Sequence, residues 1–199
     1  MDVNFWNTRY KESKYAYGTE PNDFLKSKFT ILKPHSKILC LAEGEGRNAL
    51  FLAENNHNVT AIDYSLEGLN KLSKLAKERK LNIDTLCIDL SLYKIEANKW
   101  DAIICIFGHF PSDLRKAVFN QVYSGLNNDG FFLMEAYHKN QLNYKTGGPQ
   151  VSELLYSIEE LQNDFSEFEN ISIETSIKEI EEGKYHKGTS AVIQVIASK

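Results

Sequence analysis

Short apolar runs alternate with amphipathic stretches along most of the chain, and this alternation constrains the fold more than any other feature. Residues 38–42 (ILCLA) are continuously apolar, as expected of a strand buried on both faces of a sheet. Glycines follow, and then apolar residues at helical spacing over 47–56. Because the same order recurs downstream, we expect an α/β protein with a doubly wound, mostly parallel sheet and helices on both faces.

The other elements of this core are predicted from the same two periodicities. Further strands are expected over 58–62, 83–88, 102–107 and 131–136. Helices are expected over 66–76, where leucines form one stripe and lysines the solvated face, and from Pro111 to Gly125. Residues 127–130 (NNDG) read as the turn that closes the second of these helices.

The last part of the chain behaves differently. Ser157 and Glu160 have the spacing of a capping box and predict a short helix. Residues 171–178 alternate between apolar and polar, which predicts a strand with one exposed face. Glycines flank a tip at 183–188, and 191–197 returns as an apolar strand. The parallel strands are therefore expected to end in a β-hairpin.

Length and composition favour one soluble domain. With 199 residues, 42% apolar residues and four prolines, the chain can bury a full core as a single domain over 1–199. Within it, 1–36 are expected to form an N-terminal aromatic flap and helix, and 37–199 the core. The formal net charge of −4 offers no basic surface, so we expect neither nucleic acid nor membrane as partner.

Targeting and metal signals are absent from the sequence. The N-terminus has no apolar signal core and no run has transmembrane length, which predicts a cytoplasmic location. Cys40, Cys87 and Cys105 lie in or beside apolar runs and are expected to be buried, reduced thiols. No spacing is typical of metal ligands, so no metal site is expected.

The turn after the first strand, residues 43–46 (EGEG), is the strongest candidate ligand site. Its glycines would let a ligand approach the backbone, and the helix start offers free N–H groups. The pattern G-x-G-x-x-A also satisfies a relaxed nicotinamide fingerprint, so an NAD(P)-binding oxidoreductase stays open. Glu43 favours instead a ligand that carries an ammonium and a sulfonium; the alternative is a solvated turn carboxylate.

Two further acidic positions end the next strands. Asp63 lies about 20 residues after Gly44, where a carboxylate can accept from both ribose hydroxyls of either cofactor. Its alternative role is a helix N-cap. Asp89 and Leu90 follow the third strand, beside the expected adenine pocket, where the alternative is a plain turn.

Together these motifs, with residues 100–107 (WDAIICIF) for the fourth strand, resemble the class I S-adenosylmethionine-dependent methyltransferases. The resemblance covers most of the chain and implies a Rossmann-like seven-stranded sheet whose last strand is antiparallel. Residues 46–53 (GRNALFLA) and 87–90 (CIDL) are similar to tellurite-resistance TehB-like and related small-molecule thiol methyltransferases.

The resemblance also implies roles for single residues. Glu43, Gly44 and Gly46 would hold the methionine end of S-adenosylmethionine, and Asp63 the ribose. The adenine would lie beside Tyr64, with its edge read by Asp89 and Leu90, and Phe107 would flank the sulfonium. S-adenosylhomocysteine would be the product of an activity of class EC 2.1.1.

The acceptor side is less defined. The segment after the fourth strand, 107–111 (FGHFP), lacks the Asn/Asp-Pro-Pro-aromatic and Pro-Cys motifs of enzymes that methylate nucleic-acid bases. His109, His138 and His186 could converge from three strand ends, and TehB-like proteins place a histidine and a basic residue at the hairpin, here His186 and Lys187. His186 and His109 are the candidate general bases; the alternative is that each is a polar loop residue.

Two segments are expected to flank the acceptor. The N-terminus carries Trp6, Arg9, Tyr10 and Tyr17, which suggest a lid that contacts the acceptor and excludes water, or else a flap that only covers the sheet. Residues 137–156 are expected to be a loop over the site, or else a mobile surface loop. Phe110, His138 and Lys187 complete the predicted acceptor contacts.

The sequence therefore predicts methyl transfer to a small-molecule acceptor, such as a thiol or a tellurium or selenium oxyanion. The alternatives are the oxidoreductase and a non-catalytic regulatory module that binds S-adenosylmethionine.

Overall fold

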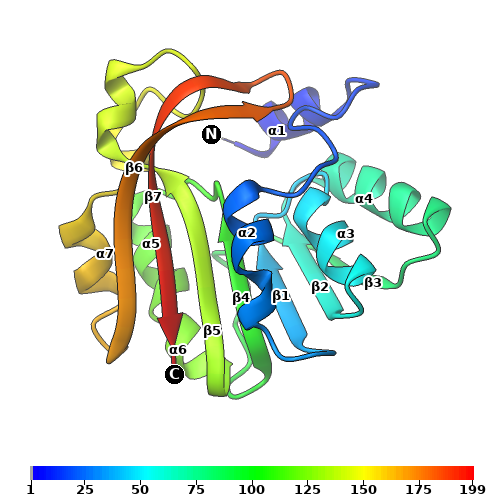
Figure 1. Cartoon of the computed structure of the whole chain (residues 1–199). Helices are drawn as coiled ribbons and strands as arrows, with labels where there is room; N and C mark the ends of the chain where they lie inside the picture. Colours follow the sequence, from blue (N-terminus) through cyan, green and yellow to red (C-terminus); the bar gives the residue numbers. More distant parts are fainter. Residues whose placement is uncertain (1) are drawn as a thin grey trace.

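The computed structural model describes residues 2–199 and is built on a seven-stranded sheet in the order β3-β2-β1-β4-β5-β7-β6 (Figure 1). The strands are β1 (Lys37–Leu41), β2 (Asn58–Asp63), β3 (Ile83–Cys87), β4 (Trp100–Ile106), β5 (Leu126–Tyr137), β6 (Asn170–Glu182) and β7 (His186–Ser198). Strands β1 to β5 pair in parallel, whereas β7 is antiparallel to both β5 and β6. The predicted doubly wound sheet with an antiparallel last strand is confirmed.

Helices cover both faces of the sheet. They are α1 (Val3–Tyr10), α2 (Asp23–Lys28), α3 (Arg47–Glu54), α4 (Leu66–Glu78), α5 (Ser112–Phe119), α6 (Val122–Gly125) and α7 (Ile158–Asp164), with 3₁₀ turns η1 (Phe29–Ile31), η2 (Lys139–Asn143) and η3 (Ser152–Leu154). Alternate residues of each strand face opposite sides. Ile38 and Cys40 thus pack in one core with α2, α3 and α4, whereas Leu39 and Leu41 pack with α5, α6 and α7 in the other.

Several local expectations are corrected by the structure. The helix predicted from Pro111 to Gly125 is broken into α5 and α6. The turn predicted at 127–130 lies within β5, where Asp129 has a φ of 61°. Cys40 and Cys105 are buried as expected, but Cys87 is exposed, because β3 is an edge strand that the helices leave largely uncovered. The capping box of Ser157 and Glu160 is present at the start of α7.

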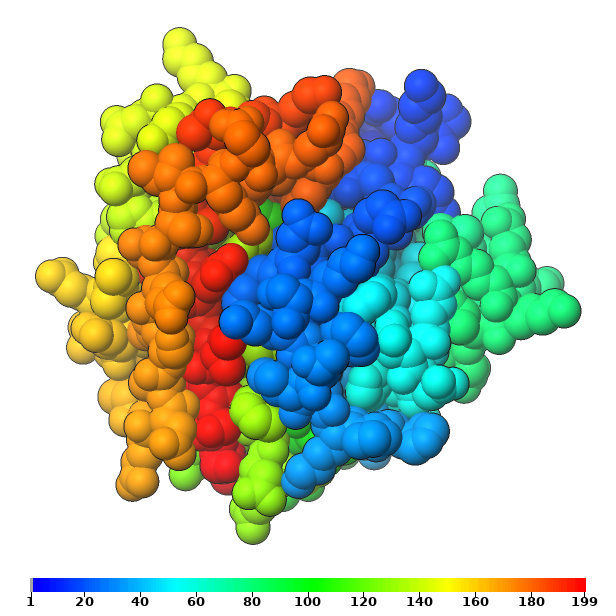
Figure 2. Space-filling view, viewed as in Figure 1, coloured from blue at the N-terminus to red at the C-terminus, as the bar shows by residue number. Residues whose placement is uncertain are grey.

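The N-terminal segment and the tip of the β6–β7 hairpin meet above the carboxyl ends of the parallel strands (Figures 1 and 2). The Ala16 N–H donates to the buried Glu45 carboxylate at 2.7 Å, and the Ala16 carbonyl accepts from the Lys184 N–H at 2.9 Å. Glu12 also pairs with Lys184 and accepts from the Tyr185 hydroxyl. These bonds fasten both segments over the edge where ligands of such sheets bind.

None of the helices within residues 2–199 has the length and apolarity needed to cross a membrane.

Candidate active site

A cavity of about 320 Å³ opens at the carboxyl ends of β1 to β4, within the size range of small-molecule sites. Most of the candidate residues line it together: Trp6, Arg9, Tyr17, Glu43, Gly46, Asp63, Tyr64, Asp89, Leu90, Phe107, His109, Phe110 and His186. Tyr10, Gly148 and Pro149 line it as well, so part of the 137–156 segment does border the site. Gly44, His138 and Lys187 are not among its lining residues.

The glycine turn is required by the fold as well as by any ligand. Gly44 and Gly46 have φ values of 62° and 89°, in the region that favours glycine. A Cβ on Gly46 would lie 2.7 Å from two carbons of Leu72, and one on Gly44 would lie 2.6 Å from the Tyr10 hydroxyl. The sequence predicts that these glycines make room for a ligand; in the structure, the missing Cβ atoms make room for side chains of α4 and α1.

Glu43 is held at the entrance to α3. Its Oε1 accepts from the backbone N–H groups of Asn48 at 3.0 Å and Ala49 at 2.8 Å. Enclosure by the fold raises the pKa of this carboxyl to about 7, because the cavity gives the charge little water. Glu43 is thus half-buried and tied to the start of α3 rather than freely solvated, and a cationic ligand group would favour its ionised form.

Asp63 supports both the glycine turn and the start of α4. Its Oδ2 accepts from the Gly44 N–H at 2.9 Å, and its Oδ1 from the Ser65 N–H at 2.7 Å. The N-cap of α4 is Ser65 rather than Asp63. Burial raises the pKa of Asp63 to about 6. The backbone N–H groups of Ser65, Gly44 and Tyr64 all favour its ionised form, and the carboxylate keeps lone-pair capacity that a ribose diol can use.

Protonation of Glu43 gives a direct prediction. With a pKa of about 7, this carboxyl is half protonated at pH 7 in the free protein, and an ammonium group bound beside it would lower its pKa. S-adenosylhomocysteine binding at pH 7 is expected to release about half a proton. The measurement is the dependence of the calorimetric binding enthalpy on the ionisation heat of the buffer.

Two glutamate-to-glutamine variants, one at Glu43 and one as its matched control, show whether Glu43 is the source of the proton. Glu43→Gln should remove most of the proton release, whereas Glu54→Gln, at the exposed end of α3 where Glu54 pairs with Arg79, should leave it unchanged. A binding enthalpy that is the same in all buffers would contradict the prediction.

The predicted adenine side combines an exposed and a buried residue. Asp89 is exposed and its Oδ1 accepts from the Ser91 N–H, so it does form the turn proposed as the alternative, while still lining the cavity. Leu90 is buried next to it. Tyr64 also lines the cavity, and burial raises its pKa to about 12.

Phe107 directly follows β4 and has a φ of 53°, a strained value for any residue other than glycine. Its ring lies 4.5 Å from that of His186 and 4.8 Å from that of Tyr137, between ring centroids. The strained turn thus brings the aromatic ring between the strand end and the hairpin.

His109 presents an unprotonated nitrogen. Its Nδ1 lies 2.8 Å from the Leu154 carbonyl, which can only accept, so Nδ1 carries the proton. Nε2 is buried and has no hydrogen-bond partner among residues 2–199. Burial lowers the pKa of His109 to about 4, so the ring is neutral near pH 7.

His186 is also buried, and it has an anionic partner that sequence reasoning missed. Its Nδ1 lies 3.4 Å from Glu182 Oε2, and its ring packs 4.4 Å from the Tyr17 ring. Burial lowers the pKa of His186, against the opposing effect of Glu182.

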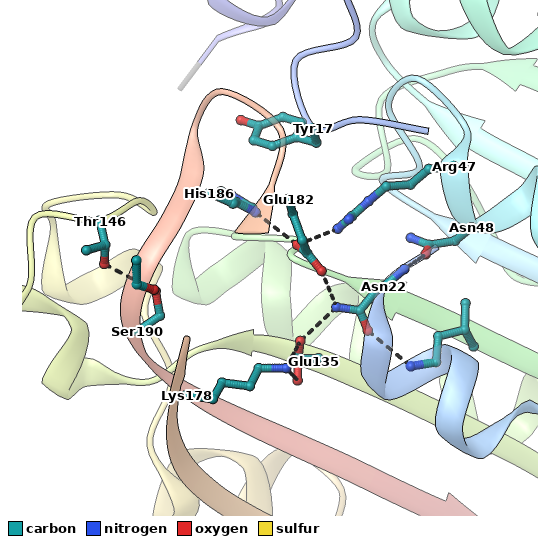
Figure 3. Close-up of polar contacts among 12 residues, drawn as sticks. Tyr17, Asn22, Arg47, Asn48, Glu135, Thr146, Lys178, Glu182, His186 and Ser190 are labelled. Atoms are coloured by element: carbon teal, nitrogen blue, oxygen red, sulfur yellow. Dashed lines mark hydrogen bonds and ion pairs between the residues drawn. The ribbon is translucent and has the colours of Figure 1, made fainter. Parts of the chain in front are cut away.

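Glu182 belongs to a buried polar network shown in Figure 3. Arg47 donates to it at 2.8 Å and Asn22 at 2.9 Å, and Asn22 also donates to the fully buried Glu135, which pairs with Lys178. Burial opposes the ionisation of Glu182, but the hydrogen bond from His186 and the Arg47 charge outweigh it and hold the pKa at about 2. Glu182 is therefore a carboxylate at any ordinary pH.

Two predicted acceptor contacts do not reach the cavity. His138 caps η2, its Nδ1 accepting from the Asn140 N–H at 3.1 Å. Lys187 is exposed and pairs with Glu181 at 3.1 Å, because adjacent residues of a strand point to opposite faces and His186 takes the inward one. The expected convergence of three histidines is wrong in that only His109 and His186 meet.

The N-terminal aromatic residues close one side of the cavity. The Arg9 guanidinium lies 4.1 Å from the Tyr185 ring centroid and 4.5 Å from that of Phe5, and donates to the Tyr17 hydroxyl at 2.7 Å. Trp6 stacks on Tyr10 at 5.5 Å. The flap therefore contributes side chains to the cavity wall and does more than cover the sheet.

Comparisons with known proteins agree with this geometry. A family model described as a methyltransferase domain matches residues 38–130. No match was found among curated proteins.

Solved structures share the fold over nearly the whole chain. TehB from Haemophilus influenzae superposes with a TM-score of 0.75 at 18% identity, over 99% of this chain and 66% of that one, so this chain spans just under two thirds of TehB. A protein studied for the conversion of a disulfide bond into a thioacetal group during echinomycin biosynthesis gives 0.76 at 15% identity, over 100% and 89%.

An S-adenosylmethionine-dependent methyltransferase from Clostridium acetobutylicum gives a TM-score of 0.66 at 18% identity, over 99% of this chain and 92% of that one. The cofactor that such a domain implies is S-adenosylmethionine, and the carboxylates of Glu43 and Asp63 fit its ammonium and ribose. Residues 38–130 thus match the model of a methyltransferase domain, and the chain as a whole has the fold of class I S-adenosylmethionine-dependent methyltransferases.

Proposed function

We propose that the protein transfers the methyl group of S-adenosylmethionine to a small-molecule acceptor. The observation that carries the proposal is that two poorly solvated carboxylates, Glu43 and Asp63, line one cavity with the imidazole of His186. The carboxylates suit a cationic, ribose-containing ligand, and the imidazole lies on the side where an acceptor would enter, beneath the N-terminal flap.

The cofactor would be held along the strand ends. Glu43 and the 43–46 turn would bind the methionine end and Asp63 the ribose, with Tyr64, Asp89 and Leu90 around the adenine and Phe107 beside the sulfonium. Bound S-adenosylmethionine supplies an electrophilic methyl group. The chain's own residues would then align the acceptor with it and exclude water, which is the main catalytic contribution expected for a direct displacement.

The two cavity histidines differ as candidate bases. A general base works best when its pKa is near the operating pH. His109, with a pKa of about 4, is a weak base, and its unpartnered Nε2 is better suited to accept a hydrogen bond from the acceptor. His186 is supported by the Glu182 carboxylate, which would compensate the charge of an imidazolium. We therefore assign the base role to His186.

Two acceptor classes remain in the proposal. The resemblance to TehB-like proteins supports a tellurium or selenium oxyanion. A sulfur acceptor is supported by the structural neighbour that takes part in converting a disulfide bond into a thioacetal group.

Calorimetry and turnover test this function. The protein should bind S-adenosylhomocysteine and form it from S-adenosylmethionine with at least one member of a panel of thiols, phenols, tellurite and selenite. Binding of NAD without binding of S-adenosylhomocysteine would establish the oxidoreductase instead. Tight S-adenosylhomocysteine binding without turnover of any acceptor would favour the non-catalytic regulatory module.

A further inference from the structure

The cationic side chains around the acceptor side are already engaged. Of the described residues that line the cavity, Arg9 and Arg47 are the cationic ones. Arg47 is neutralised by Glu182 at 2.8 Å, with only 9% of its side chain exposed. Arg9 is packed among the rings of Phe5, Trp6 and Tyr185 and donates to Tyr17. An oxyanion would therefore find no lysine and no unengaged arginine there, whereas an anion usually requires such partners.

The walls of this side are aromatic. The rings of Tyr17, Phe107, Phe110 and Tyr185 border it, as does Trp6 of the flap. Such rings bind a planar aromatic ligand by stacked and edge-to-face contacts. The aromatic lining, and the lack of an unengaged cationic side chain among the described lining residues, favour an uncharged aromatic molecule over a small oxyanion.

The hairpin register pairs Glu182 with His186 directly across the tip. Because the ionised Glu182 can only accept, His186 Nδ1 carries the proton and Nε2 carries the lone pair. Nε2 is therefore the ring nitrogen with which His186 can accept a proton from a ligand in the cavity that it lines. Arg47 and Asn22 hold Glu182 from α3 and the N-terminal segment, so its orientation does not depend on the hairpin alone.

Resting on the proposed function, we infer that the acceptor is an uncharged aryl thiol or phenol, and that Glu182 is the positioning residue that keeps His186 Nε2 turned to take its proton.

The step balances as one proton transfer and one displacement. The acceptor X–H gives its proton to His186 Nε2, and X forms a bond to the methyl carbon as the carbon–sulfur bond of S-adenosylmethionine breaks. The electron pair of that bond stays on sulfur, which gives S-adenosylhomocysteine. The imidazolium is stabilised by Glu182 until it returns the proton to water.

Several charged and titratable groups act on His186 besides Glu182: Arg9, Arg47, Tyr17, His109 and Tyr137. The arginines disfavour its protonated form and Glu182 favours it. A Glu182→Gln variant should therefore move the acidic limb of the pH profile to lower pH, because the negative charge that favours the protonated form of His186 is lost.

The experiment measures kcat/KM for a series of para-substituted thiophenols and phenols of graded acidity, with tellurite and selenite alongside. Wild-type protein should prefer the aromatic acceptors. In Glu182→Gln, kcat/KM should fall about 10- to 100-fold for weakly acidic phenols, yet change little for thiophenols that are already ionised at the assay pH. A merely structural loss would slow all acceptors alike.

Glu181→Gln is the matched control. Glu181 is the neighbouring residue, but its side chain is 80% exposed whereas that of Glu182 is 11% exposed. It should behave as wild type. Because Glu182→Gln leaves Arg47 unpaired and could fail to fold, His186→Gln is run in parallel and should show the same dependence on acceptor acidity.

Four outcomes overturn the inference: faster turnover of tellurite or selenite than of any aromatic acceptor, an equal loss on ionised and un-ionised acceptors in both variants, no loss on any acceptor in either variant, or the same loss in Glu181→Gln. Turnover of tellurite or selenite that is faster than that of any aromatic acceptor, by a protein that binds S-adenosylhomocysteine, refutes only this inference. Absence of both binding and turnover refutes the proposed function itself.

Discussion

An Asp63→Ala variant should bind S-adenosylhomocysteine at least about 100-fold more weakly than wild-type protein. A hydrogen bond to a charged group contributes roughly 1.5–3 kcal/mol, and Asp63 can accept two from a ribose diol. At about 1.4 kcal/mol for each factor of ten, the loss of both exceeds two orders of magnitude. Calorimetric titration measures the change.

Controls separate a binding role from a folding role. Asp63 also accepts from the Gly44 and Ser65 N–H groups, so the alanine variant must be checked by thermal unfolding. Asp63→Asn keeps one oxygen acceptor and should lose less affinity. Asp84→Ala, at an exposed position of β3 outside the cavity, should lose none. A loss under about fivefold in a folded Asp63→Ala protein would refute the ribose role.

The pH dependence of this affinity has a definite sign. Because the pKa of Asp63 is about 6 in the free protein, acidification protonates the group that must accept two hydrogen bonds. The affinity of wild-type protein should therefore fall more steeply below about pH 6, beyond the decline that protonation of Glu43 begins near pH 7, and the profile of Asp63→Asn should lack this steeper part.

The fold could be predicted because its signals are local. Residues 38–42 and 102–107 are continuous apolar runs in or next to β1 and β4, and α4 carries a leucine stripe, so period and order are enough to place a parallel sheet. Expectations failed where the outcome depends on what lies beside an element. Cys87 borders an apolar run and is predicted to be buried, but β3 is the edge strand of the sheet and leaves this side chain exposed.

The cofactor side was predictable for the same reason, since Glu43, Asp63 and Asp89 each follow a strand whose end can be read from the sequence. The polar network around Glu182 could not be predicted in this way. Asn22 bonds to Glu135 across 113 residues, and nothing local distinguishes either from a surface residue. The hairpin offers one signal for Glu182. This residue directly precedes Gly183 at the tip, and the register of β6 and β7 places it opposite His186.

The glycine turn is where local and long-range constraints coincide, and Gly46→Ala should be among the most destabilising substitutions in the chain. A side chain at a φ of 89° costs about 1–2 kcal/mol, and forcing Leu72 aside in a packed core costs about 1–3 kcal/mol more. Denaturant unfolding of the free protein should therefore show a loss of about 2–5 kcal/mol.

Gly18→Ala separates these two costs. Gly18 also has a positive φ, 73°, but its nearest neighbour to an added Cβ is the Gly183 nitrogen at 3.8 Å, an ordinary contact. That variant should lose only the conformational part, about 1–2 kcal/mol. Equal losses in the two variants would mean that Leu72 moves aside freely.

If the overlap with Leu72 is the cause, Leu72→Ala should cost less in the Gly46→Ala background than in the wild type, because truncating Leu72 relieves the overlap that the new methyl group creates.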